Sequence, residues 1–528
     1  MKRFYSVLLF LAMTSGSVWA QYIVSGVVED AATGEPLIGV SVVEQGTTNG
    51  NVTDLDGYFS LNLQQANPVL QLSYVGYTTL EVPISRKGSL GVISMEAETV
   101  GLQDITITGQ MAVSRKTPVA VSQVTALDIE QKVVNGEFVE ILKSTPGVHY
   151  NREGGGWGDA EIYMRGFDNT NIAVLVNGVP MNGMEDSKVY WSNWQGLSDV
   201  TSVMQTQRGI GASKMSAPSV GGTINVITKG IDAKMGGSLS YAMGNDGFNK
   251  VLFSVSTGMM NNGWAFTILG GRTWGDGYIQ GTSFTGYNYF VNISKRINDS
   301  HQLSLTGFGA PQEHYQRAYQ NGLTMSEWNS IKKYMKEGVH WTRYNPMLGT
   351  LNGKEFNSNK NVYHKPQISL NHIWQIDHKS SLSSTAYVSI GRGYGWTAEA
   401  GLNSTHSYSD LTSAATFGKL KKIFWNDENG TFDYDQVVAE NKASEYGSQL
   451  VHCQNRNYHN WVGVTSTYAN RFADCVDFTA GIDIRYYEGV HNATICGLLG
   501  GDYYIDATRS GSAIKAENNS RKNDENWV

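Results

Sequence analysis

The sequence predicts a mainly β protein with three parts: a small N-terminal β-sandwich, an α+β domain, and the first part, about nine strands, of an antiparallel transmembrane β-barrel. Beyond residue 20, no apolar run approaches the roughly 18 residues that a membrane helix needs. Several stretches of the second half instead alternate apolar and polar residues with a period of two. The connections between them are alternately tight and long, as in outer-membrane barrels.

Composition agrees with this class. A chain of 528 residues is long enough for two or more domains. The mean hydropathy of -0.29, with 28 Tyr, 13 Trp and 59 Gly, suits barrel strands, which are apolar on one face only. The net charge of -7 is modest, so the sequence indicates no nucleic-acid partner.

Residues 1–20 have the pattern of a secretory signal peptide. Lys2 and Arg3 give a positive start, and Val7–Met13 is a short apolar segment. This segment is too short to span a bilayer, and small residues precede the expected cleavage after Ala20.

Residues 21–98 contain short strand-like runs separated by turn residues, which predicts a small antiparallel sandwich. The runs are Tyr22–Glu29, Val40–Gln45, Tyr58–Asn62, Val69–Tyr74 and Thr78–Ile84. Asp54 and Asp56 precede Gly57, a combination that could hold calcium. Because position 52 is valine instead of the acidic residue of an EF-hand loop, we predict a hairpin turn there.

The segments Gly34–Val42, Thr53–Leu61 and Ser73–Tyr77 resemble carboxypeptidase-regulatory-like domains, which often precede receptor domains in Bacteroidetes. A zinc peptidase would need two convergent ligands such as an H-x-x-E pair, and no histidine of the chain has glutamate three residues later. We therefore expect a non-catalytic periplasmic appendage.

The linker, residues 99–116, contains a β-prone run that includes Asp104, Ile105, Thr106, Ile107 and Thr108 and ends at Gly109. It resembles the TonB box, the segment that energised TonB pulls by adding it as a strand to its own sheet. Strand addition depends little on sequence, so a second interpretation remains: the run is the last strand of the first domain.

Residues 117–229 predict an α+β domain. A helix is expected over Ala126–Ser144, ended by Pro146 and Gly147. The strand Ile172–Val176 is followed by an Asn-Gly turn, and a second strand is expected over Thr223–Thr228. The glycine-rich segment 154–158 lacks the spacing of a phosphate-binding loop, so we expect a flexible loop there.

Both ends of this domain resemble the plug domain of TonB-dependent outer-membrane receptors. The residues that carry the resemblance include Arg165, Gly166, Asn177, Gly178, Arg208, Gly221 and Gly222. The resemblance implies a plug inside a barrel. We expect Arg165 and Arg208 to form internal salt bridges to the barrel wall, because a plug held by polar contacts can be moved by a pulling force.

Residues 230–528 predict the partial barrel. The expected strands are 236–244, 249–260, 264–274, 286–296, 302–310, 363–376, 381–392, 457–470 and 475–487. The tight turns are Asn261–Gly263, Ile297–His301, Asp377–Ser380 and Arg471–Asp474. The connections between them are the long loops 275–285, 311–362 and 393–456, apart from a tight first hairpin at Asn245–Phe248. A soluble sandwich would alternate in the same way, but it has no reason to sort its loops by length.

Receptors of the family have roughly 22 strands around a plugged lumen. The polar segment Ser510–Val528 does not alternate and does not end on an aromatic residue. We therefore expect a truncated chain with two unpaired strand edges, which lipid does not tolerate, and no transport by this chain alone.

The cysteines are Cys453, Cys475 and Cys496, with no C-x-x-C pair. Cys453 and Cys496 fall on the long-loop side of the predicted barrel. If a disulfide forms, we predict that it joins these two. Three cysteines without a disulfide is the alternative.

The resemblance implies energy-coupled import of a scarce nutrient across the outer membrane of a Bacteroidetes-like bacterium. The implied partners are TonB with ExbB and ExbD, outer-membrane lipids, a small nutrient ligand and a surface lipoprotein. The run Val220–Ile224 is closer to siderophore and cobalamin receptors than to glycan importers, so a siderophore, cobalamin, an oligosaccharide or a peptide all remain candidates.

Trp157, Trp191 and Trp194 are candidate ligand-binding residues, although core packing would explain them equally well. A non-transporting surface barrel or adhesin is the alternative function. The chain contains no H-E-x-x-H or G-x-S-x-G motif, so we predict no enzyme activity, no cofactor and no metal site.

Overall fold

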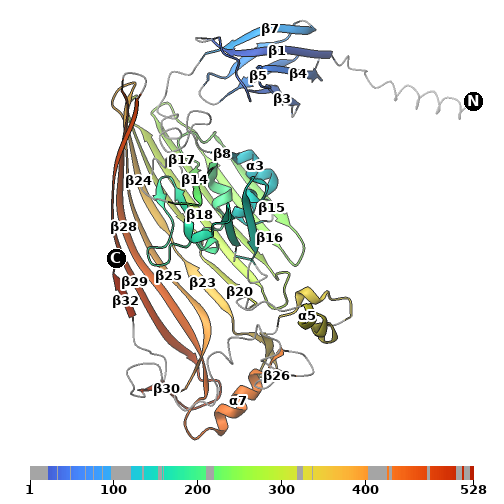
Figure 1. Ribbon diagram of the computed structural model, residues 1–528, viewed down its shortest axis with the longest axis vertical. Helices are drawn as coiled ribbons and strands as arrows, with labels where there is room; N and C mark the ends of the chain where they lie inside the picture. The colour runs from blue at the N-terminus through green and yellow to red at the C-terminus, as the bar shows by residue number, and fades with distance from the viewer. Residues whose placement is uncertain are drawn as a thin grey trace, which may run out of the picture. The chain divides into compact units, whose positions relative to one another are not determined.

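The computed structural model divides the chain into two compact units, Met1–Asp104 and Ile105–Val528, and each is described by itself. Figure 1 shows the order of the elements along the chain. The described residues are 22–31, 34–47, 49–65, 67–74, 77–85, 87–96, 120–133, 136–152, 157–158, 160–209, 219–317, 325–335, 337–345, 347–401, 425–426, 431–472, 476–506, 514–516 and 524–527.

The first unit is a β-sandwich, as predicted. One sheet has the order β4-β1-β7 and the other the order β3-β2-β5-β6. The strands are β1 (Tyr22–Asp30), β2 (Ser41–Glu44), β3 (Gly50–Val52), β4 (Tyr58–Leu63), β5 (Val69–Ser73), β6 (Leu80–Pro83) and β7 (Gly88–Met95). Val24, Phe59, Leu70 and Leu72 are fully buried between the sheets.

Two features of this sandwich differ from the prediction. The strands β3 and β7 were not expected, and β7 runs parallel to β1 instead of antiparallel. β7 contains Gly88 and Gly91 and alternates poorly, so its pairing with the free edge of β1 is decided by the tertiary fold. The Asp54 turn is a hairpin turn, in which the Asp54 carboxylate accepts the N–H groups of Asp56 (3.0 Å) and Tyr58 (2.9 Å).

The second unit begins with a five-stranded sheet of order β12-β11-β14-β13-β8, in which β11 and β14 are parallel. Its strands are β8 (Ala120–Thr125), β11 (Ile172–Val176), β12 (Val179–Pro180), β13 (Thr201–Arg208) and β14 (Gly222–Thr228). The predicted Asn-Gly turn joins β11 to β12, with φ of 50° at Asn177 and 82° at Gly178.

The helix predicted over Ala126–Ser144 is wrong in its length. The structure has a short helix α3 (Ala126–Lys132) and a separate 3₁₀ helix η1 (Phe138–Ser144). Thr125 caps α3 in a capping box with Asp128. Gly136 lies between the two elements, and glycine disfavours a helix interior.

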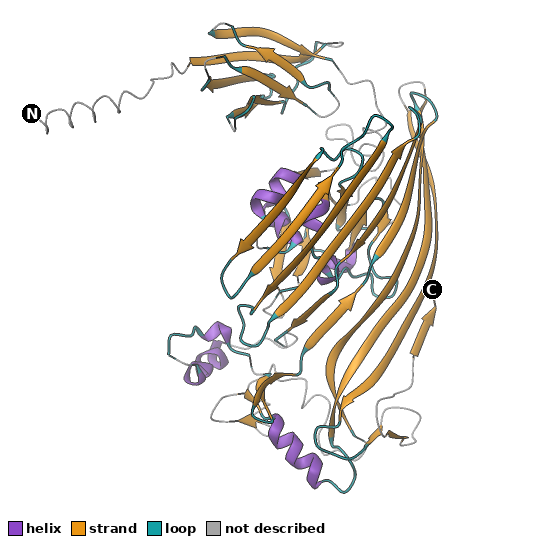
Figure 2. Ribbon diagram, turned by 180° about the vertical axis from the view of Figure 1, so that it is seen from behind, coloured by secondary structure: helices purple, strands orange, loops and turns teal. Residues whose placement is uncertain are grey.

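Smaller elements complete this domain: the hairpin β9 (Val148–Arg152) and β10 (Ala160–Met164), the 3₁₀ turns η2 (Asn169–Asn171) and η3 (Trp191–Trp194), and the short helix α4 (Leu197–Val200). Figure 2 shows these helices against one face of a large curved sheet, and Figure 1 agrees from the opposite side. The domain therefore packs inside the curve of the sheet, as a plug does.

The large sheet is antiparallel and contains all nine predicted barrel strands. Its order is β15-β16-β17-β18-β19-β24-β25-β28-β29-β32, with β20 and β23 paired beside this path. The strands are β15 (Gly236–Met243), β16 (Asn249–Ser256), β17 (Trp264–Gly275), β18 (Phe284–Arg296), β19 (His301–Gly309), β20 (Gln312–Tyr315), β23 (Lys360–His364), β24 (Gln367–Gln375), β25 (Ser380–Ala400), β28 (Leu450–Phe472), β29 (Val476–Gly497) and β32 (Asp524–Trp527).

Three strands are longer than predicted. β25, β28 and β29 reach residues 400, 450 and 497 and extend into segments that were predicted as loops. These extensions carry polar runs such as Gln454–Tyr458, which do not alternate in hydrophobicity. Alternation is required only where one strand face meets lipid, so a strand that continues beyond the apolar band leaves no such pattern.

The two faces of the sheet differ as expected. On β18, Tyr287, Tyr289 and Val291 are exposed, whereas Asn288, Phe290 and Asn292 are buried toward the plug. The same outward apolar face appears at Val251, Phe253 and Val255 on β16 and at Ile482, Ile484 and Tyr486 on β29. The outward face is therefore an apolar band and the inward face a mixed polar surface.

The long connections contribute the elements at one end of the sheet (Figure 1). They are α5 (Met325–Ile331), η4 (Lys332–Tyr334), η5 (Trp341–Arg343), β21 (Leu348–Leu351), β22 (Lys354–Asn357), β26 (Trp425–Asn426), β27 (Thr431–Phe432), α7 (Tyr434–Ala443), β30 (Tyr504–Asp506) and β31 (Ile514–Ala516). In the described part of the chain, no helix has the length and apolar character needed to cross a membrane.

We predict that Gly222→Ala destabilises the plug by about 2 kcal/mol or more. Gly222 has φ of 146°, and an added Cβ would collide with the Gln207 carbonyl and the Met164 sulfur. Gly236→Ala is the matched control, because nothing lies within 4 Å of its added Cβ. Thermal unfolding of the detergent-solubilised protein measures both; equal melting temperatures for the two variants would contradict the prediction.

Candidate functional site

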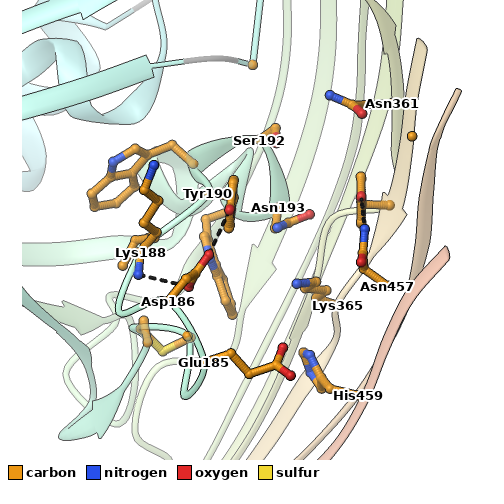
Figure 3. A pocket seen from close by; sticks show the side chains of 18 of the residues that line it. Glu185, Asp186, Lys188, Tyr190, Ser192, Asn193, Asn361, Lys365, Asn457 and His459 are labelled. Atoms are coloured by element: carbon orange, nitrogen blue, oxygen red, sulfur yellow. Dashed lines mark hydrogen bonds between the residues drawn. The ribbon is translucent and has the colours of Figure 1, made fainter. Parts of the chain in front are cut away.

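A cavity of about 570 Å³ lies between the plug and the inward face of the sheet. The plug side consists of the loop after β12 and the 3₁₀ turn η3, and the wall side comes mainly from β23, β25, β28 and β29. Figure 3 shows acidic, basic and amide side chains that point into it from both sides. The cavity is bounded partly by a plug and partly by a wall, so a movement of the plug would reshape it.

Aromatic side chains on neighbouring strands form the floor of the wall side. Trp461 on β28 lies edge-on to Tyr387 on β25 (5.8 Å between ring centroids) and to Tyr487 on β29 (6.1 Å). Glycines make room for such rings: a Cβ at Gly463 would collide with the ring of Tyr387, and one at Gly393 with the ring of Tyr363. An aromatic ring that packs over a glycine of the neighbouring strand is held in place, so the aromatic side of the cavity is rigid.

Several buried polar atoms at the cavity lack a hydrogen-bond partner among the described residues. They include the indole Nε1 atoms of Trp191 and Trp396 and the Oδ1 of Asn193. An unsatisfied buried polar group costs about 1–3 kcal/mol. A ligand with hydrogen-bond acceptors for the two indole N–H groups would remove that cost, because an indole N–H can only donate.

The charges around the cavity are of both signs. Glu161, Glu185 and Asp186 are acidic, and Lys188 and Lys365 are basic. Amide side chains are numerous in the lining: Asn193, Gln316, Asn359, Asn361, Gln367, Asn455 and Asn457. The cavity therefore suits a polar ligand that does not carry a large net charge.

Two of the three candidate tryptophans lie at this cavity. Trp191 and Trp194 line it, and Trp194 also stacks on Phe308 of the wall (6.0 Å, 14° between planes). Trp157 is outside the lining and stacks on Phe284 (4.4 Å, 16°). A ligand-binding role for all three stays a prediction.

Tyr387, Trp396 and Trp461 line the cavity from the wall, and the sequence pattern did not lead us to predict this role. A signal was present for Tyr387, which alternates with the outward residues Ala386 and Val388 and so had to face inward. Trp396 lies in the extension of β25, where the alternation stops, and only the structure places it.

The glycines of the plug motif occupy tight positions. Gly221 precedes β14 and Gly222 is its first residue; a Cβ on Gly221 would lie 2.9 Å from both the Asn171 carbonyl and the Phe167 side chain. Asn177 fixes its own turn, because its side chain donates to Thr228 Oγ1 (2.8 Å) and accepts the Thr228 N–H (2.9 Å). Gly166 follows Arg165 in a turn of left-handed backbone, with φ of 84° and 53°.

The expected arginine salt bridges to the wall are wrong for the described residues. Arg208 Nη1 donates to the Pro146 carbonyl (2.6 Å), a contact that stays inside the plug. The contact of Arg165 is made by its backbone, whose N–H donates to the Gly147 carbonyl (2.8 Å) from the left-handed turn after β10. The guanidinium of Arg208 therefore braces the plug itself.

Other residues connect the plug to the wall. Asp199 of α4 forms an ion pair with Lys250 of β16 (2.6 Å), and Asn288 of β18 donates to the same carboxylate (3.2 Å). The amide of Asn371 donates to the Asn177 carbonyl (3.1 Å). An apolar cluster that includes Leu269, Phe290 and Phe308 also extends from the wall into the plug, so apolar contacts hold the plug to the wall as well.

The predicted disulfide does not form. Cys453 and Cys496 lie on the paired strands β28 and β29, but Cys453 is opposite Ile495 and Cys496 is exposed. The Cys496 thiol contacts His452 instead (3.3 Å to Nδ1). A one-residue offset in a strand turns a side chain to the other face, which separates the two sulfurs. Cys475 and the coupling residues Asp104–Thr108 lie outside the described residues.

Two family models match the chain. Residues 24–107 match the CarboxypepD_reg-like domain and residues 113–223 the TonB-dependent Receptor Plug Domain. The TonB-dependent receptor P39 of Formosa agariphila is 29% identical over 43% of this chain and 21% of its own length. The TonB-dependent receptor SusC of Bacteroides thetaiotaomicron is 29% identical over 31% of this chain and 16% of its own length.

A solved structure of the FpvAI–pyocin S2 complex is similar in fold, with a TM-score of 0.50 and 11% identity, over 91% of this chain and 52% of that one. The chain thus spans about half of that structure, and its alignments span 21% and 16% of the two curated relatives' lengths.

We predict that Asp199→Ala loosens the plug more than the double variant Asp199→Ala/Lys250→Met does. The side chains of Asp199 and Lys250 are only 11% and 17% exposed, so removal of the carboxylate leaves a buried cation without its counter-ion. Proteolysis of the plug at increasing urea concentration gives its free energy of unfolding in each variant. We expect the two values to differ by about 1–3 kcal/mol. Equal or greater loosening in the double variant would contradict it.

Proposed function

We propose that this chain, a member of the TonB-dependent receptor family, supplies the plug and part of the wall of an energy-coupled importer in the outer membrane. The family consists of receptors and transporters, not enzymes. The observation that carries the proposal is the cavity shared by plug and wall at the long-loop end of the sheet. A ligand bound there would contact both parts, so a pull on the plug would change its site.

The plug–wall contacts support this mechanism. The polar links, such as the largely buried pair Asp199–Lys250, are hydrogen bonds and ion pairs that depend on close contact, so a shift of the plug breaks them. The apolar side chains of the plug, such as Val174, Met204 and Ile224, pack in one cluster that also includes wall residues, so a shift of the plug would separate part of that cluster. TonB, energised by ExbB and ExbD, would pull on the linker segment Asp104–Thr108.

For the ligand we propose a neutral oligosaccharide, presented to the cavity with the help of a surface lipoprotein. Aromatic rings such as Trp461 and Tyr487 offer flat apolar faces, and the amides and indole N–H groups offer partners for hydroxyl oxygens. The mixed charges of the lining favour this class over an anionic siderophore. Cobalamin and peptides are the alternative ligands, and the assays below distinguish them from an oligosaccharide.

We predict that deletion of Asp104–Thr108 from the complete gene product abolishes uptake and leaves ligand binding intact. Deletion of Ala112–Lys116, an equally long piece of the same linker, should leave uptake largely unchanged. Growth on a limiting oligosaccharide, cobalamin or ferric siderophore reports uptake, and binding to whole cells reports the site. Uptake that survives the first deletion would favour the adhesin alternative.

A substitution pair separates strand addition from side-chain recognition at the linker. Ile107→Pro removes a backbone N–H from the added strand, whereas Ile107→Ala keeps it. Only the proline variant should lose uptake. Loss in both variants would indicate that the isoleucine side chain, and not backbone pairing, is recognised.

We predict that Trp396→Phe weakens binding of the imported oligosaccharide by about three- to tenfold, the worth of one neutral hydrogen bond. Phenylalanine keeps an aromatic face but removes the indole N–H. Trp264→Phe is the matched control, because Trp264 is 37% exposed and packs beside Phe266 near a tight turn, away from the cavity. Isothermal titration measures both; unchanged affinity for Trp396→Phe would remove this residue from the site.

A further inference from the structure

The plug loop that runs from β12 to η3, residues 181–190, is held by hydrogen bonds of its own and by hydrogen bonds to β11, and we call it the latch loop. Asn182 braces it: its side chain accepts the Val174 N–H (2.8 Å) and donates to the carbonyls of Ile172 (2.9 Å) and Ser187 (2.8 Å). The Tyr190 hydroxyl donates to Asp186 within the same loop (2.7 Å). The loop is therefore expected to move as one piece.

The latch loop is tied to the last long strand of the wall through Glu185. The Nε2 of His491 on β29 lies 2.9 and 3.0 Å from the two carboxylate oxygens of Glu185. The Tyr487 hydroxyl donates to the same carboxylate (3.2 Å). Both wall residues line the cavity, so this tie closes one side of it.

The second nitrogen of His491 also faces an acceptor. Its Nδ1 lies 2.7 Å from the Oδ1 of Asn457, the residue directly opposite on β28. The orientation of that amide places its Nδ2 toward the Tyr363 hydroxyl, to which it donates (3.1 Å). With acceptors at both ring nitrogens, the arrangement is complete only when the imidazole carries two protons and a positive charge.

We propose that His491 and Glu185 form a proton-dependent latch: protonated His491 holds the latch loop against β29, and loss of a proton to solvent loosens the loop and opens that side of the cavity. An ionic hydrogen bond is stronger than a neutral one, so deprotonation weakens the tie. The inference concerns the loop itself and does not depend on which nutrient is imported, or on import at all.

The neighbouring charged groups determine which residue pairs with the Glu185 carboxylate after His491 loses its proton. Lys365, between β23 and β24, interacts electrostatically with both Glu185 and Asp186, so it can hold the carboxylate when His491 becomes neutral. The other titratable or charged groups on the elements around the latch are Asp186, Lys188, Arg456, His459, Asp483, Arg485, Tyr487 and Glu488. Of these, Arg485 is paired with Asp483 on its own strand and so does not compete for Glu185.

The sign of the pH dependence follows from the contact. The loop is held while the His491 imidazole carries two protons and is released when it loses one, so the tie weakens as the pH rises. The Glu185 carboxylate is the acceptor in this contact, so the proton that switches the tie is the one on His491.

Hydrogen–deuterium exchange of the complete gene product in detergent tests the proposal without any ligand. Protection of residues 181–190 should fall by about tenfold between about pH 5.5 and about pH 8, the worth of one charge-assisted hydrogen bond. Rates are corrected for the intrinsic pH dependence of exchange and compared with β18 as an internal reference. Equal corrected protection at the two pH values would overturn the latch.

Variants identify the switching group. His491→Gln should give low protection at both pH values, and His378→Gln, in an exposed turn away from the plug, should behave as the native protein. If His491→Gln does not fold, Glu185→Gln answers the same question, because it keeps the shape of the side chain and removes the charge. A variant at either latch residue that retains the native pH response would contradict the proposal.

Discussion

The alternation of the wall strands is the constraint on which the rest of the structure depends. Each strand shows apolar side chains on one face and polar or aromatic ones on the other, as β18 does with Tyr289 outward and Asn288 inward. The outward face suits lipid, because a membrane has no water to satisfy polar groups. The inward face meets the plug with polar as well as apolar contacts, and this makes a shared cavity possible.

Two kinds of contact hold the plug in the wall, and they have different consequences. Aromatic stacking such as Trp194 on Phe308 and the buried pair Asp199–Lys250 fix where the body of the plug sits. The latch loop reaches the wall through Glu185 at the edge of the cavity, and also through Met184 beside Arg485 (3.6 Å) and Tyr190 beside Lys365 (5.9 Å). Release of Glu185 removes one of these contacts without moving the plug body, so cavity access and plug movement can be controlled separately.

The sequence was informative where local chemistry decides the structure. Asn177-Gly178 specified a hairpin turn, and the alternation around Val291 and Ile484 specified strands with the correct outward face. It failed where tertiary contacts decide. Nothing local predicts that β7 pairs parallel to β1, that Arg208 bonds to Pro146 inside the plug, or that Trp396 reaches the cavity from a strand extension without alternation. The cavity could be anticipated only in part, from Trp191 and Trp194.

The central claim is that the plug must move against the wall for import. Reversible cross-linking of the plug body tests it most directly: Asp199→Cys and Lys250→Cys, in a protein whose native cysteines are replaced by serine, are joined by a short cleavable thiol linker. The account predicts that nutrient uptake stops while the linker is intact, that ligand binding persists, and that uptake returns on cleavage to the rate of the same double variant before cross-linking. Uptake at the native rate with the linker in place would contradict it.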